Sequence, residues 1–96
     1  MSTKEKLVNE LINWLKNKGV VELKYIQTID PPGRGIEIKL QDGTTIDEVS
    51  LDEETTDNVD TLFRLLEHLK KIPESEEAQE VQFEVNGLTL KYEFWA

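Results

Sequence analysis

The pair Asn86-Gly87 near the end of the chain constrains the fold more than any other feature of the sequence. Two runs of alternating apolar and polar residues flank it, and this arrangement is typical of a β-hairpin with a two-residue turn. Such a turn pairs Val85 with Leu88 and brings the apolar residues of both runs to one face. They are Val81, Phe83, Val85, Leu88, Leu90 and Tyr92. Turn chemistry and apolar pattern therefore predict the same antiparallel register.

The first residues of the chain have the pattern of an amphipathic helix. Ser2 and Glu5 have the spacing of a capping box, and Gly19 can provide a left-handed cap at the other end. The apolar residues between them recur at helical spacing: Leu7, Val8, Leu11, Ile12 and Leu15. The sequence therefore predicts a helix from Thr3 to Lys18.

After this helix the apolar period changes to two, which indicates strands. The alternating residues of the first run are Val21, Leu23, Tyr25, Gln27 and Ile29. The segment 30–35, rich in proline and glycine, is predicted to break the strand, and a second strand follows over 36–40. A three-residue loop over 41–43, ending in a glycine bulge, keeps Ile46 on the buried side of a third strand.

The segment from Asp52 to Asp60 is predicted to lead into a second helix. Its apolar stripe is Val59, Leu62, Phe63, Leu66 and Leu69, with Leu65 and Ile72 at the margin. Thr56 or Asp57 is expected to cap its start, and Pro73 is expected to end it.

These elements predict an α+β fold in the order α-β-β-β-α-β-β. Consecutive strands are joined as hairpins, so the sheet is expected to be mainly antiparallel. Each helix has one apolar stripe and each strand one apolar face, which favours a two-layer sandwich with both helices packed on one face of the sheet. No linker-like segment divides the chain, so residues 1–96 are predicted to form a single domain.

The sequence offers little for catalysis. It has no cysteine and a single histidine, His68, which lies at the edge of the second helix's stripe near the helix end. No Ser-His-Asp set, paired-carboxylate cleft or glycine-rich phosphate loop can be assembled. We therefore predict a non-enzymatic protein without a cofactor. The absence of an apolar leader or membrane-spanning run favours a cytoplasmic location.

Charge is the most unusual bulk property. The net charge is −9, yet residues 1–40 hold seven basic and five acidic residues, and residues 41–96 hold four and fifteen. Direct nucleic-acid binding and attraction to anionic membranes are disfavoured, because both need a basic surface. A basic partner protein is favoured instead.

The acids gather around the second helix, and three interpretations compete. They could bind a basic partner, or hold a calcium or magnesium ion, although their spacing does not match a twelve-residue calcium loop. Those at the helix start also complement the helix dipole, which needs no partner at all. The predicted partner-binding residues are Asp47, Glu48, Asp52, Glu53, Glu54, Asp57, Asp60, Glu74, Glu76 and Glu77.

The sequence thus favours a small interaction domain, whose sharpest form is an inhibitor or nucleic-acid mimic that docks on the basic surface of a nucleic-acid-binding protein. The alternative is a subunit or scaffold module, natural or designed, that self-associates as a homodimer through apolar surface. Phe94 and Trp95 favour the alternative, because adjacent strand residues point to opposite faces and one of them leaves the core. Arg34, between two glycines, is predicted to lie in a hairpin turn.

Overall fold

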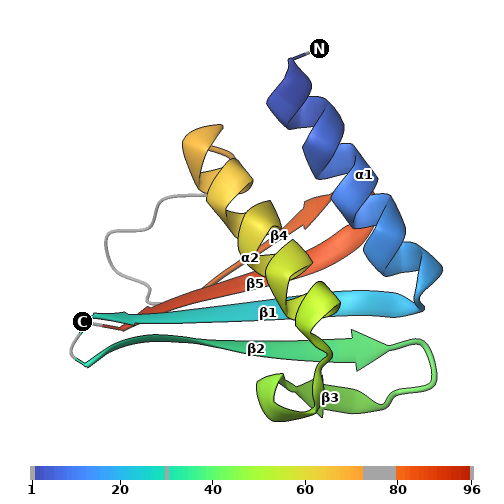
Figure 1. Cartoon of the computed structure of the whole chain (residues 1–96), viewed down its shortest axis with the longest axis vertical. Helices are drawn as coiled ribbons and strands as arrows, with labels where there is room; N and C mark the ends of the chain where they lie inside the picture. The colour runs from blue at the N-terminus through green and yellow to red at the C-terminus, as the bar shows by residue number, and fades with distance from the viewer. Residues whose placement is uncertain (1, 30, 73–79, 96) are drawn as a thin grey trace.

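The computed structural model describes residues 2–29, 31–72 and 80–95 as a two-layer α+β sandwich, which confirms the predicted fold class (Figure 1). Both helices lie on one face of a five-stranded sheet. The elements in chain order are α1 (Thr3–Asn17), β1 (Val20–Ile29), β2 (Pro32–Leu40), β3 (Thr45–Asp47), a 3-10 helix η1 (Glu48–Ser50), α2 (Glu53–His68), β4 (Glu80–Val85) and β5 (Leu88–Trp95).

The strand order is β3-β2-β1-β5-β4. Three of the four strand pairs are antiparallel, as predicted, and β1 and β5 pair in parallel at the centre. The parallel pair arises because the chain crosses the sheet through α2 between the two hairpin units. The pairing places Tyr25 of β1 beside Tyr92 of β5, which matters for the cavity described below.

Both turns that fix the register form as predicted. Asn86 and Gly87 have φ of 49° and 84°, and Val85 pairs with Leu88. Gly43 has φ of 88°, and Ile38 pairs with Ile46. The β4–β5 hairpin therefore has the register that its turn and apolar pattern specify.

The β1–β2 hairpin differs from its prediction at both ends. The pairing shifts between Val20 and Glu22, so Val20 is buried and Val21 is exposed. At the other end β2 begins at Pro32, which pairs with Ile29. The glycines of segment 30–35 do not end the strand, because Gly33 and Gly35 keep their backbone pairing with Thr28 and Ile26.

The start of α2 was also predicted in the wrong place. Asp52, not Thr56 or Asp57, is the residue before the first helical turn, and Thr55 is buried inside the helix. The helix ends at His68. Lys70 follows with φ of 55°, and its backbone N–H and that of the next residue bond to carbonyls of the last turn. Pro73 lies outside the described residues.

The core lies between the helices and the inner face of the sheet. Both predicted helix stripes supply it, although Leu7 is exposed. At the start of α1, Ser2 accepts a hydrogen bond from the backbone N–H of Glu5, and Gly19 has φ of 87° after its end. Within the described residues, neither helix combines the length and apolarity needed to cross a membrane.

The outer face of the sheet is charged and internally paired. Lys24 bonds to Glu93 at 3.0 Å, and Lys91 to Glu22 at 2.6 Å, both between the parallel strands β1 and β5. The acidic excess of the chain therefore does not lie on these central strands.

Candidate functional site

The carboxylates at the beginning of α2 are exposed to solvent. Asp52 precedes the helix, Glu53 and Glu54 occupy its first turn, and Asp57 lies one turn further. Within the described part of the chain, none of these four forms an ion pair. We call Asp52, Glu53, Glu54 and Asp57 the α2 acidic cluster.

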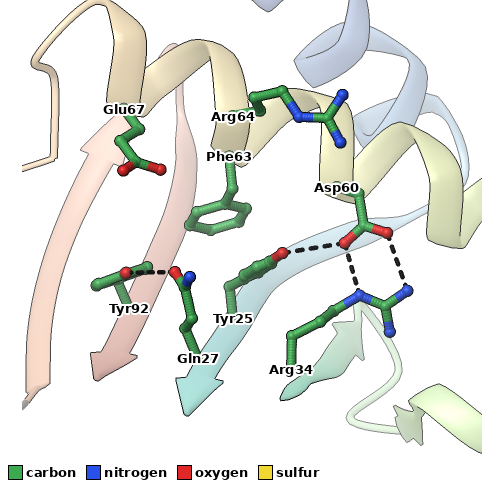
Figure 2. Close-up of a pocket in the computed structure, with 8 residues that line it drawn as sticks. All are labelled: Tyr25, Gln27, Arg34, Asp60, Phe63, Arg64, Glu67 and Tyr92. Carbon is green, nitrogen blue, oxygen red and sulfur yellow. Dashed lines mark hydrogen bonds and ion pairs between the residues drawn. The ribbon is translucent and has the colours of Figure 1, made fainter. Parts of the chain in front are cut away.

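Asp60 is arranged differently from its neighbours in the sequence. It points from α2 toward the sheet, where the Nε and Nη2 atoms of Arg34 donate to its two carboxylate oxygens at 2.7 and 2.9 Å (Figure 2). The hydroxyl of Tyr25 donates to the same carboxylate at 3.0 Å. Arg34 also forms an ion pair with Glu48 of η1. Asp60 and Glu48 are thus engaged within the chain and tie α2 and η1 to β1 and β2.

The surroundings of this ion cluster change how its members titrate. Burial, reinforced by the nearby Asp60 carboxylate, raises the pKa of Tyr25 to about 12. The hydrogen bonds to Asp60 raise the pKa of Arg34 above its already high ordinary value. At neutral pH Tyr25 is therefore a neutral donor and Arg34 a fixed cation, so the cluster is a lasting structural link.

A cavity of about 320 Å³ lies beside this link, between α2 and the sheet. Tyr25 stacks on Phe63 with ring centroids 4.5 Å apart, and Tyr92 lies 6.2 Å from Phe63. The Tyr92 hydroxyl donates to the side-chain oxygen of Gln27 at 2.8 Å. Among the described residues that line the cavity there is no serine, threonine, cysteine or histidine. Its chemistry is that of an aromatic wall with a polar rim.

The remaining predicted residues do not join the α2 acidic cluster. Asp47 pairs with Glu37 across β2 and β3, on the face of the sheet opposite the inward-pointing Ile46. Glu74, Glu76 and Glu77 lie outside the described residues. His68 is exposed at the end of α2, and the described residues contain no group of three or more side chains arranged to hold a metal ion.

The chain matches no protein-family model, no curated protein and no solved structure. What the protein does must therefore be inferred from the contacts, exposure and charge of its own residues.

Arg34 is the main site residue that the sequence interpretation placed wrongly. It lies in β2 opposite Gln27 and not in a turn. A signal for this was present, because Arg34 continues the alternation of Ile36 and Ile38 and so faces the helices. An arginine on an inward face needs a carboxylate partner, and Asp60 lies on the inner side of the predicted helix.

Proposed function

We propose that the protein is a non-enzymatic interaction domain that binds a basic surface of a partner protein through the α2 acidic cluster. One observation carries the proposal: these four carboxylates are exposed and form no ion pair within the described residues, although Asp52 is hydrogen-bonded to Thr55, whereas Asp60 and Glu48 beside them are ion-paired. A partner with lysines or arginines would supply the counter-charge. Its approach would be accelerated by attraction to a chain of net charge −9.

The position of the acids also serves the helix, and the two roles can be separated. Acids in a first helical turn stabilise it by about 0.3–1 kcal/mol each through the helix dipole. Asparagine caps a helix about as well as aspartate, and glutamine keeps the shape of glutamate. A variant with Asp52→Asn, Glu53→Gln and Glu54→Gln therefore keeps the cap and the side-chain shapes while it removes the charge that attracts a partner, at a cost of about 1–3 kcal/mol in stability for the three acids together.

The sharpest form of the proposal is an inhibitor or nucleic-acid mimic acting in the cytoplasm on a nucleic-acid-binding protein. Exposed carboxylates present the negative charge that such a protein recognises in phosphates. In this form the protein displaces a fluorescent oligonucleotide from its partner. A partner that binds the domain and the oligonucleotide together would exclude mimicry and leave the docking proposal standing.

The experiment compares this triple variant with a control of equal charge. The control changes three exposed acids of the outer sheet face, by Glu37→Gln, Glu80→Gln and Glu84→Gln.

Both variants and the wild type are titrated with a lysine-rich peptide by NMR at low and physiological salt. We expect the triple variant of the α2 acidic cluster to lose most of the binding and the control to keep it, with weaker binding at higher salt. Equal losses in both variants would mean that only net charge attracts the peptide, and would refute a docking site on α2.

Self-association is the second candidate, favoured by apolar side chains at one end of the sheet. Ile29, Phe94 and Trp95 are all exposed, and their strands β1 and β5 run side by side there. Sedimentation of the wild type and of a Phe94→Ser, Trp95→Ser variant tests it. A wild-type dimer that the variant abolishes, with no effect of salt, would favour this candidate over the first.

A further inference from the structure

An apolar cleft of about 440 Å³ adjoins the α2 acidic cluster. Asp52, the first residue of that cluster, lies in its wall together with Ser50. Its apolar lining consists of Val20, Ile38, Leu40, Ile46 and Leu51. We call it the β3 cleft, because Ile46 of β3 and the turn of chain that follows form one side.

The cleft exists because the two helices leave one corner of the sheet uncovered. α1 ends at Asn17, and α2 begins only at Glu53, so the carboxyl end of β2 lies between them (Figure 1). Val20 and Ile38 are buried at this corner, but Leu40, Ile46 and Leu51 remain partly exposed. Covering this apolar surface with another apolar group removes it from water, which is favourable through the hydrophobic effect.

We propose that the β3 cleft receives an apolar side chain of the basic partner, while the α2 acidic cluster binds the basic residues beside that side chain. This inference rests on the proposed function and narrows the partner to a segment in which lysines or arginines flank a leucine-like residue. A cleft of this volume accommodates such a side chain. Interfaces commonly combine a central apolar anchor with a charged rim in this way.

Charge selects this occupant over a second copy of the chain. A second copy carries a net charge of −9, so its acids would meet those of the first. The one base in the cleft wall, Lys18, holds its ammonium 4.6 Å from the ring centroid of Trp14 on α1. Hydrogen bonding to Thr55 lowers the pKa of the Asp52 carboxyl, and Lys18 adds a smaller effect in the same direction, so Lys18 offsets part of that charge. Glu53 and Glu54, in the first turn of α2, are left for the bases of a partner segment.

The test uses two short lysine peptides that differ only in their central residue, leucine in one and serine in the other. Each is titrated into labelled protein while the backbone amides of α2 and the methyl groups of Ile46 and Leu51 are followed by NMR. A Ser50→Tyr variant fills the cleft from an exposed position without removing core atoms. Thr45→Tyr is the matched control, because Thr45 is exposed on β3 and pairs with Lys39 on the outer face.

We expect the leucine peptide to bind about tenfold more tightly than the serine peptide, since it buries an apolar side chain as well as the charges. It should shift the methyl groups of Ile46 and Leu51, and Ser50→Tyr should abolish its advantage while Thr45→Tyr keeps it.

Equal binding of both peptides, with shifts confined to the amides of α2, would overturn the cleft and leave the basic-partner function standing. If neither peptide shifts the amides of α2, the proposed function itself fails, and this inference with it.

Discussion

Replacing Asp60 by asparagine tests whether the internal ion cluster holds α2 against the sheet. The substitution keeps the size of the side chain but removes the charge that Arg34 binds through two hydrogen bonds of 2.7 and 2.9 Å. It also replaces one acceptor oxygen by an NH2 group, which faces donors on Arg34 or Tyr25. Arg34 keeps its ion pair with Glu48, so it is not left without a counter-charge.

The expected loss of stability follows from the exposure of the pair. Side chains of Asp60 and Arg34 are 23% and 30% exposed, so the pair lies between the surface and the interior. A shielded hydrogen bond to a charged group contributes about 1.5–3 kcal/mol, and an exposed ion pair less than about 1 kcal/mol. We therefore expect Asp60→Asn to lower the free energy of unfolding by about 2 kcal/mol. In a domain of this size that corresponds to a fall of roughly 8–16 °C in Tm.

Urea unfolding followed by circular dichroism measures this loss, with Asp57→Asn as the control. Asp57 lies nearly one turn earlier on α2, and it forms no ion pair among the described residues, so its loss should change stability by less than about 0.5 kcal/mol. A double-mutant cycle with Tyr25→Phe should give a coupling of about 1 kcal/mol to Asp60. Equal effects of Asp60→Asn and Asp57→Asn would refute the structural role of the cluster.

Four further predictions concern single residues. The pKa of Tyr25 is raised from 10.0 to about 12, so its contribution to stability should be complete below pH 10 and lost as the pH rises to 12. Tyrosinate absorbance should show that Tyr25 titrates late. Asp60→Asn should move this titration to lower pH, because the Asp60 carboxylate helps to raise the pKa. Lys70 has φ of 55°, so Lys70→Gly should raise the free energy of unfolding by about 0.5–1 kcal/mol in urea titrations, and no gain would contradict the left-handed cap. Gly87 has φ of 84°, so Gly87→Ala should lower the free energy of unfolding by about 1 kcal/mol or more. Leu23 is fully buried in the centre of the core, so Leu23→Ala should lower the free energy of unfolding by about 2–5 kcal/mol.

The sequence was sufficient for the fold wherever two local signals agreed. The β4–β5 hairpin was predicted residue by residue, because Asn86-Gly87 and the apolar alternation require the same register. The parallel pairing of β1 with β5 could not be predicted, since it joins segments that no turn connects and depends on how α2 crosses the sheet. Val20 and Val21 show a third case: two adjacent valines leave the phase of a strand ambiguous, and only packing decides it.

The candidate site was predictable only in outline. The position of the exposed acids follows from the helix start, which the sequence located within a few residues. Which acids are neutralised does not follow, because Arg34 reaches Asp60 and Glu48 across distances in the chain that no local pattern encodes. Asp47, by contrast, lies on the other face of the sheet because it alternates with the inward-pointing Ile46 in β3, and that alternation could be predicted.

The internal cluster and the proposed docking surface make opposite demands on neighbouring acids of one helix. Asp60 stabilises the fold through its ion pair with Arg34. Because Arg34 neutralises this carboxylate, Asp60 attracts a basic partner less strongly. Glu53 and Glu54 stabilise the fold only through the helix dipole, and their charges are exposed to solvent. Stability and binding should therefore respond to different substitutions. Neutralising Asp60 should lower the free energy of unfolding with little change in affinity for a lysine peptide. Neutralising Glu53 and Glu54 should lower that affinity with a smaller change in the free energy of unfolding. A common response of both properties to both changes would mean that α2 carries one electrostatic function and not two.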